Sequence, residues 1–226
     1  MKVSEYIDYL VTGECSKLAI SDVGDMTANP SPAPSAVQAV NQNKFINYVN
    51  LANLALHKRF HLLKKDYEMD NPLDGEEYNL PTDFLVPIHA YYASDFDQVA
   101  VKDDSVKLVQ KVDQHVAILI PEPFKAEIKG TDAETPKRSQ IILRYAAAPK
   151  KAKNTYTDLK INEVYTEALI NYAAYKAHVT TSGDLKDENN TYYMRYEASC
   201  KQLINSGMWG NNEIEINTKL EDNGFV

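Results

Sequence analysis

The feature that most constrains the fold is the spacing of apolar residues, which is helical towards both ends of the chain and strand-like in the middle. In residues 36–64 and 159–207 apolar side chains recur every three or four positions, as on one face of a helix. In residues 65–147 they form short β-branched or aromatic runs separated by Asp, Lys, Pro and Gly. This order predicts an α+β fold in which an antiparallel β subdomain is inserted into a helical bundle.

The first half of the bundle is expected to be one long helix. Ser35 and Gln38 have the spacing of a capping box, in which the serine caps the helix and the glutamine reaches back. Helical spacing then continues from Ala36 to about Leu63. At 1.5 Å per residue the predicted helix is roughly 40 Å long, well above the average for globular proteins.

The second half of the bundle is expected to be a helical hairpin. One helix is predicted from about Leu159 to Val179, and a second from about Lys186 to Asn205. Ser182, Gly183 and Asp184 interrupt the pattern between the two helices, and Gly207 is placed to end the second. Two consecutive helices with a short turn pack antiparallel.

Three segments lie outside the bundle and the β subdomain. Residues 1–23 predict an N-terminal amphipathic helix, capped by Ser4 and running towards Leu18. Residues 24–35 contain alternating prolines and predict an extended linker that lies on a surface or reaches a neighbour. Residues 208–226 are polar and acidic with isolated apolar side chains, which predicts a tail that a partner orders.

Within the β subdomain, strands are expected around seven short runs. These runs are residues 66–69, 77–80, 84–92, 99–101, 106–109, 116–120 and 141–145. Pro87 lies inside one of them and has no backbone N–H to donate, so its strand is expected at an edge or at a bulge.

Charge and cysteine usage narrow the function classes. The formal net charge is −8, which argues against a primary DNA-binding protein and is compatible with a surface that DNA passes without sticking. Cys15 and Cys200 lack metal-ligand spacing and are expected to stay reduced. No signal peptide and no membrane span is recognisable, so a protein made in a cytosol without membrane contact is expected.

The aromatic composition is uneven, with 15 tyrosines against 6 phenylalanines. Tyrosine combines a large apolar ring with a hydroxyl that can stay hydrated, so it is favoured at protein–protein contacts. Such a composition indicates interfaces, although simple scatter in aromatic usage gives the same count.

Motifs for catalysis or cofactor binding are not found. His57 and His61 are four residues apart on the long helix, where they could bind a metal or simply complement the helix dipole. No phosphate-binding loop, dinucleotide fingerprint or nucleophile elbow occurs. We therefore expect no catalytic residue, no metal and no cofactor.

Two sets of residues are candidates for partner contacts. Lys150, Lys151 and Lys153 form a basic connector that could face DNA or an acidic partner, or remain a solvated loop. Trp209 follows the last helix and could anchor an interface or pack back onto the hairpin. The apolar residues of the tail beyond it are Ile214, Ile216, Leu220 and Phe225.

Two stretches of the chain carry a resemblance to a known family. The first is Tyr78–Phe84 (Tyr-Asn-Leu-Pro-Thr-Asp-Phe), which leads into the β subdomain. The second is Ile161–Ala177 followed by Asp187–Cys200, where small residues line one helix and an acidic, tyrosine-containing helix follows. In these stretches and in the order of its elements over residues 36–206, the chain resembles the head-to-tail adaptors of short-tailed phages, the tail tubular protein A type. It is also similar to the ring proteins of crAss-like phages.

This resemblance implies a structural role in a virion. It implies a homo-oligomeric ring, a dodecamer, clamped beneath the portal protein and made in the cytoplasm of a bacterial host. The helical bundle would form the ring wall, and DNA would pass through the lumen. Residues 209–226 would contact the portal, while the linker and the β subdomain would meet neighbouring copies or downstream tail or ring proteins.

Two other function classes stay open from the sequence. A small cytoplasmic enzyme, hydrolase-like, would have a buried histidine beside a nucleophile in a deep pocket. A monomeric binding module would have a short, ordered C-terminus and would not assemble.

Overall fold

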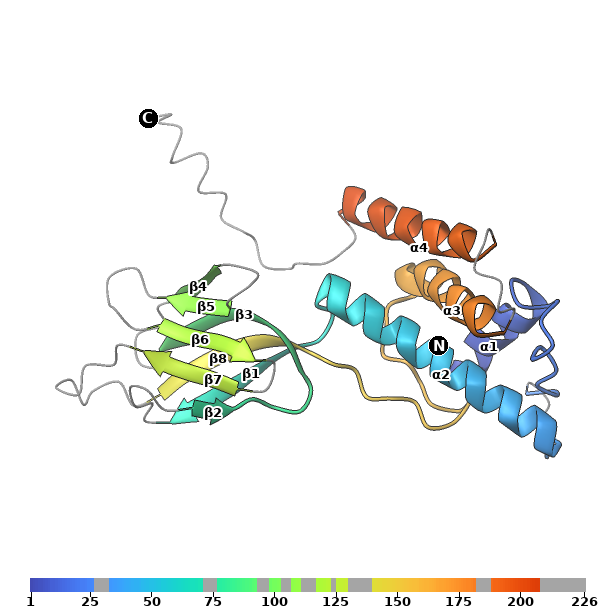
Figure 1. The fold of residues 1–226 in the computed structure, drawn as a ribbon, viewed down its shortest axis with the longest axis horizontal. Helices are drawn as coiled ribbons and strands as arrows, with labels where there is room; N and C mark the ends of the chain where they lie inside the picture. The colour runs from blue at the N-terminus through green and yellow to red at the C-terminus, as the bar shows by residue number, and fades with distance from the viewer. Residues whose placement is uncertain are drawn as a thin grey trace.

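The computed structural model describes residues 1–26, 33–70, 77–92, 98–102, 107–110, 117–122, 125–129, 140–181 and 188–207. It confirms the α+β class. A helical bundle occupies one end of the molecule and an antiparallel sheet the other, and the chain runs from bundle to sheet and back (Figure 1).

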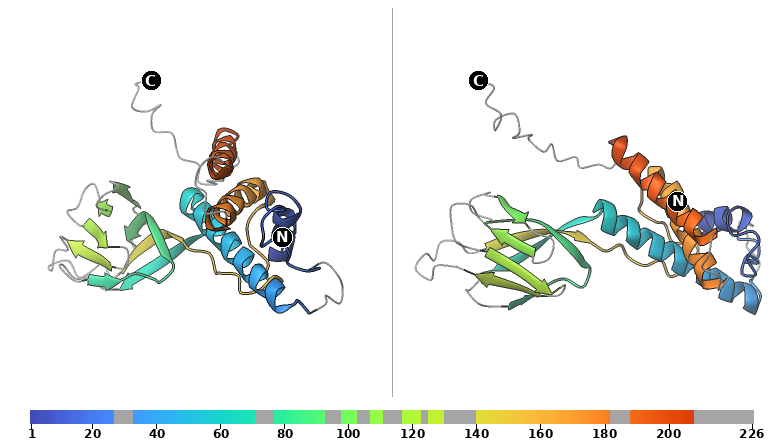
Figure 2. Two further views of the ribbon diagram at one scale, coloured as in Figure 1. Left: turned by 45° about the vertical axis from the view of Figure 1, so that its right-hand side comes forward. Right: turned by 45° about the horizontal axis from the view of Figure 1, so that its top comes forward.

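The bundle contains four α-helices among the described residues. They are α1 (Val3–Thr12), α2 (Ala36–Phe60), α3 (Thr166–Thr181) and α4 (Glu188–Asn205), with the 3₁₀ turn η1 (Glu163–Tyr165) leading directly into α3. Helix α3 lies between α2 and α4, and α1 packs against α2 and α3 (Figures 1 and 2).

The beginning of α2 is as predicted. The Ser35 amide donates to Gln38 Oε1 at 2.9 Å, and the Gln38 amide donates to Ser35 Oγ at 3.3 Å, which completes the capping box. The helix ends at Phe60, three residues before the predicted end, because His61 adopts a left-handed conformation with φ of 49°. From there the chain turns towards the sheet.

Helix α1 differs from its prediction at both ends. It begins at Val3 with Lys2 as N-cap, and the amides of Val3 and Ser4 donate to the carbonyls of Thr157 and Thr155. This distant segment satisfies the N–H groups of the first two residues of the helix, so the helix begins one residue before the expected cap, Ser4. The helix ends at Thr12 because Gly13 follows, and a Cβ on Gly13 would lie 2.8 Å from the Tyr9 carbonyl oxygen.

The bundle is held together by one apolar core. The face of α2 that helical spacing predicted is buried, as are the matching faces of α1, α3 and α4. Its central residues, each fully shielded from solvent, are Val3, Tyr6, Ile7, Leu10, Phe45, Val49, Ala52, Leu56, Ala168, Leu169, Ala173, Ala174 and Ala177.

The sheet is antiparallel throughout. Its strands are β1 (Lys64–Asp70), β2 (Glu77–Asn79), β3 (Phe84–Tyr92), β4 (Gln98–Lys102), β5 (Lys107–Gln110), β6 (Ala117–Glu122), β7 (Lys125–Lys129) and β8 (Gln140–Ala147), in the order β1-β8-β3-β4-β5-β6-β7-β2. Strand β7 was not predicted. Pro87 lies in β3, between β8 and β4, next to a shift in register, so it is accommodated at a bulge rather than at an edge.

The sheet joins the bundle through β1 and β8, which pair from Lys64↔Ala146 to Asp70↔Gln140. The Ala147 amide donates to the Leu63 carbonyl at 2.7 Å, so the two crossings between bundle and sheet lie side by side. At this base the Tyr145 hydroxyl donates to Asp83 Oδ1 at 3.0 Å, and Lys65 forms an ion pair with the same carboxylate.

Part of the proline-rich linker lies outside the described residues, which include Pro34 but not Pro30 or Pro32. The segment before it runs along the first half of α2. Asn41 Nδ2 donates to the Asp22 carbonyl at 2.9 Å, and Gln42 Nε2 donates to the Val23 carbonyl at 2.7 Å. These contacts leave the opposite side of α2 uncovered.

Candidate partner-binding surfaces

A row of side chains on α2 faces solvent and is defined here as the α2 stripe. Its members recur every three or four residues and are Val37, Val40, Lys44, Asn47, Leu51, Leu54 and Lys58. Three aliphatic members are well exposed: Val37 by 66%, Val40 by 54% and Leu51 by 46%. At 1.5 Å per residue the stripe is about 32 Å long.

The α2 stripe gives the helix a second apolar face. The first face, which includes Phe45, Val49 and Leu56, is fully buried in the bundle. Single exposed aliphatic side chains are common on protein surfaces, but several aligned along one helix indicate a contact surface. The stripe is therefore the main candidate for a protein–protein interface on the described residues.

The charge of α2 is one-sided. The helix contains no Asp or Glu, and Lys44 and Lys58 project from the stripe into solvent. Neither lysine has an anionic partner within the described part of the chain. The stripe thus combines apolar side chains with positive charge that no described residue compensates.

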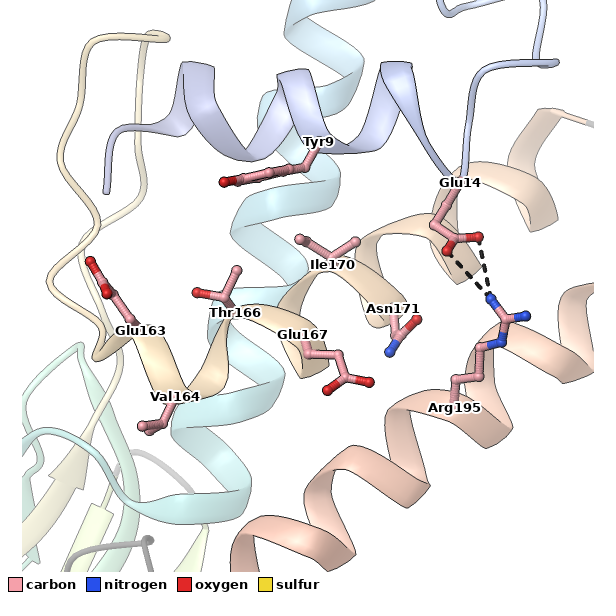
Figure 3. A pocket seen from close by; sticks show the side chains of 9 residues that line it. All are labelled: Tyr9, Glu14, Glu163, Val164, Thr166, Glu167, Ile170, Asn171 and Arg195. Carbon is pink, nitrogen blue, oxygen red and sulfur yellow. Dashed lines mark hydrogen bonds and ion pairs between the residues drawn. The ribbon is translucent and has the colours of Figure 1, made fainter.

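The second candidate surface is a groove between α1, α3 and α4, with a volume of about 690 Å³. The groove residues are Tyr9, Glu14, Glu163, Val164, Thr166, Glu167, Ile170, Asn171 and Arg195. Tyr9 comes from α1, Glu163 and Val164 come from η1, and Arg195 comes from α4 (Figure 3).

The groove carries negative charge beside apolar side chains. Arg195 and Glu14 form an ion pair at 3.4 Å at one end (Figure 3). Glu163 and Glu167 have no cationic partner among the described residues. The negative charge of Glu163 also affects Tyr6 of α1. Burial raises the pKa of Tyr6, and the nearby Glu163 carboxylate raises this pKa further.

The predicted basic connector is present as an extended segment beside α2. The Ala152 amide donates to Asn50 Oδ1 at 2.8 Å, and Asn50 Nδ2 donates to the Ala152 carbonyl at 2.9 Å. Because Ala152 is buried by these contacts, Lys150, Lys151 and Lys153 are held in solvent on either side of it. Nothing in the sequence pattern pointed to Asn50 as the residue that fixes the connector.

Other basic residues near the connector do not join it. Arg144 Nε donates to Asp66 Oδ1 at 2.9 Å and Nη2 donates to Asp66 Oδ2 at 3.2 Å, so this arginine belongs to the β1–β8 pair. Lys137 and Arg138 lie outside the described residues.

The predicted tail contacts also lie outside the described residues. They are Trp209, Ile214, Ile216, Leu220 and Phe225. The glycine expected to end the last helix does so: Gly207 has φ of 66°, and its amide donates to the Ile204 carbonyl at 3.1 Å.

The two histidines considered as metal ligands do not share a helix face. His57 is buried with Nδ1 2.9 Å from the Asn53 carbonyl oxygen, whereas His61 lies beyond the end of α2. Burial lowers the pKa of both imidazoles. No group of three potential metal ligands occurs in the part of the chain that the structure describes.

The cysteines are unpaired and buried, as expected. Burial raises the pKa of the Cys15 thiol to about 12 and also raises that of Cys200. Both therefore stay as neutral thiols at neutral pH, and neither lines the groove.

The tyrosines divide between packing and exposure. Ring contacts join α3 to α4: the centroids of Tyr172 and Tyr196 are 4.9 Å apart, and those of Tyr175 and Tyr193 are 5.3 Å apart. Tyr9 remains exposed at the groove. Some of the tyrosine excess thus serves intrachain packing, and the expectation of tyrosine-rich interfaces stays a prediction.

None of the described helices is long and apolar enough to span a bilayer. Comparison with protein-family models and with curated proteins finds no match for this chain.

Proposed function

We propose that the chain is a virion structural protein, a head-to-tail adaptor that forms a ring between the portal and the tail. The single observation that carries this proposal is the α2 stripe, because a second apolar face on the longest helix needs a partner. The ring is a dodecamer, it extends the DNA channel, and it is part of the virion at the portal vertex.

The arrangement of the bundle supports this role. A ring wall needs a rigid unit that meets its neighbours over a long surface. Helix α2 is held by the apolar core from Phe45 to Phe60, and the stripe runs along its other face. The observed order of a long helix, an inserted sheet and a helical hairpin is also the order on which the adaptor resemblance rests.

The remaining contacts follow from the same proposal. The tail residues Trp209, Ile214, Ile216, Leu220 and Phe225 reach the portal protein. The exposed lysines of the connector face passing DNA or an acidic partner, and the sheet meets downstream tail or ring proteins. In this role the chain needs no catalytic residue and no cofactor.

An enzyme is less well supported than an assembly protein. The groove is the natural place for a hydrolase site, but its lining includes neither a histidine nor a cysteine. The buried imidazoles of His57 and His178 each lie 2.9 Å from a backbone carbonyl oxygen, those of Asn53 and Glu14. This bonding is typical of structural histidines.

The test is the mass of the protein by light scattering, alone and mixed with portal rings from the same source. We expect monomers that convert into a large cyclic complex when portal rings are present, because a ring template supplies many neighbouring sites. A protein that stays monomeric and ignores the portal would overturn the proposal.

A variant of the stripe sharpens this test. Replacing Val37, Val40 and Leu51 by serine removes the exposed apolar side chains without touching the core. We expect this triple variant to fold and to lose the portal-dependent complex. Ile204→Ser, an exposed apolar residue near the end of α4, is the control and should assemble like the parent.

A further inference from the structure

We propose that the α2 stripe of one copy docks into the groove of a second copy, so that copies join head to tail. This inference rests on the proposed function, because it names the surfaces through which the ring would close. It is carried by three observations: the placement of the two surfaces, their charges and the match between the groove and one segment of the stripe.

The two surfaces lie on opposite sides of the bundle. Helix α2 turns its buried face to α1 and α3, so the stripe faces away from those helices. The groove side chains lie on the far side of α1 and α3 from α2, which passes behind them in Figure 3. A single copy therefore cannot bring its stripe to its own groove, but two copies can.

The charges are complementary. On the stripe, Leu51 stands between Lys44 and Lys58, each seven residues or about 10 Å away along the helix. In the groove, Glu163 and Glu167 line the surface together with the apolar side chains of Val164 and Ile170. Both lysines and both glutamates lack partners within the described chain, so docking would pair charges that are otherwise uncompensated.

The groove also matches the length of one segment of the stripe. Along α3 and η1 the groove extends from Glu163 to Asn171, about 12 Å at the rise of an α-helix. This is close to the distance from Lys44 to Leu51. Leu51 then contacts Val164 and Ile170, while Lys44 reaches the carboxylates at the groove edge.

The same charges disfavour a symmetric dimer through two stripes. An antiparallel pairing about Leu51 would place Lys44 of one copy against Lys58 of the other, and like charges at an interface repel. Stripe-to-groove docking is heterologous instead. Repeated copies of such a contact either close into a ring or continue as a filament, and only the rotation per copy decides between them.

The experiment is disulfide cross-linking in the full-length chain, with and without portal rings. Cys15 and Cys200 are fully buried, so the native chain is the background control. Leu51→Cys and Val164→Cys are made singly and together, and each protein is oxidised with copper phenanthroline. We expect the double variant to give a ladder of covalent oligomers, and a mixture of the single variants to stop at the dimer.

Charge reversal provides a second readout that needs no cysteine. Lys44→Glu with Lys58→Glu should weaken self-association about tenfold, as should Glu163→Lys with Glu167→Lys. The two pairs combined should restore it to within about twofold. Lys17→Glu with Lys201→Glu is the control for the lysine pair. It lowers the net charge by the same amount at other exposed positions and should have little effect on self-association.

Each outcome decides between the two proposals. A chain that assembles on portal rings without the mixed cross-link keeps the adaptor function and overturns stripe-to-groove docking, as does efficient cross-linking of Leu51→Cys with itself. A ladder without any binding to portal rings supports the docking and overturns the adaptor function. A chain that stays monomeric in both conditions overturns both.

Discussion

The bundle and the sheet are stabilised in different ways. The buried residues of the bundle's core cluster come from all four helices, from the segment after α1 and from the connector, and between residues 61 and 151 only the partly buried Leu62 packs against them among the described residues. The sheet has buried residues of its own, and at its base Phe84 packs on Tyr145 with ring centroids 5.4 Å apart. Each region therefore has its own apolar contacts, and each can be perturbed separately.

Their surfaces differ as well. In the sheet, side-chain exposure is described mainly near the bundle, and no large apolar side chain is well exposed in that part; those that are well exposed belong to the bundle or its connector. At the base of the sheet, ion pairs are prominent instead, such as Arg144 with Asp66 and Lys65 with Asp83. Among the residues whose exposure is described, the bundle therefore offers the apolar surface that we propose contacts other copies.

The largest effect on stability is expected from the bundle core. Phe45→Ala removes a fully buried ring that meets Tyr48 edge-to-face, and should lower the free energy of unfolding of the bundle by about 4 kcal/mol. Val37→Ala, on the exposed stripe, should change it by less than about 0.5 kcal/mol. Hydrogen exchange measures the two regions separately. If Phe45→Ala lowered protection in β1 and β8 as much as in the bundle, the two regions would not be stabilised separately.

A smaller effect is expected at the base of the sheet. Tyr145→Phe leaves the Asp83 carboxylate without its hydroxyl donor and should cost about 1.5 kcal/mol in denaturant unfolding. Tyr67→Phe on the paired strand β1 is the matched control and should cost less.

The pH dependence of the parent protein gives a second check on Tyr145. Burial and the Asp83 contact raise the pKa of Tyr145 from its usual 10 to about 12. The folded state thus holds this proton more tightly than the unfolded state. The resulting stability is complete below pH 10 and is lost as the pH rises towards 12, and Tyr145→Phe should remove this alkaline loss.

A third effect concerns the contact between α2 and α4. Arg59 Nη1 and Nη2 donate to the two oxygens of Glu197 at 2.6 and 3.0 Å, and this bonding lowers the pKa of Glu197 below its ordinary 4.5. The stabilisation from this ion pair is present above pH 4.5 and is lost as the pH falls through the lowered pKa of Glu197 in the folded state. Glu197→Gln should cost about 1 kcal/mol at pH 7, since the pair is partly exposed.

The acid limb of a stability–pH curve measures this contribution. The curve of Glu197→Gln should be flatter below pH 4.5 than that of the parent. Glu167→Gln, an exposed glutamate of α3, is the control. A curve for Glu197→Gln that is as steep as the parent's would mean that the ion pair contributes nothing.

The smallest effect on stability is expected at the basic connector. Reversing Lys150, Lys151 and Lys153 to glutamate should change stability by less than about 0.5 kcal/mol, because all three are exposed and unpaired among the described residues. The triple variant should bind portal rings or DNA more weakly than the parent, and this difference should be largest at low salt. Unchanged binding at every salt concentration would identify the connector as a solvated loop.

Local signals predicted much of the fold. The capping box at Ser35 fixed the start of α2, and Gly207 marked the end of α4. Strand β7 was missed because Lys125, Glu127 and Lys129 alternate with few apolar residues. The start of α1 was missed because the amides of its first two residues bond to a distant segment, residues 155–157, that no local pattern reveals.

The candidate surfaces were harder to predict than the fold. The groove joins residues of α1, η1, α3 and α4, and only the folded chain brings them together. The α2 stripe did leave a signal, because Val37, Val40 and Leu51 keep helical spacing on a face that the predicted core does not use. Whether a helix buries one face or two is decided by its neighbours, which local spacing does not show.

The most direct test of the central claim, that the bundle is the assembling unit, is the mass of a chain that lacks the sheet. Lys64 and Ala146 are paired across β1 and β8, so two glycines in place of residues 65–145 can close the gap. Light scattering at concentrations where the intact chain assembles, with portal rings if required, should give a folded protein with the same number of copies. A shortened chain that folds but stays monomeric, or that does not fold, would contradict the account.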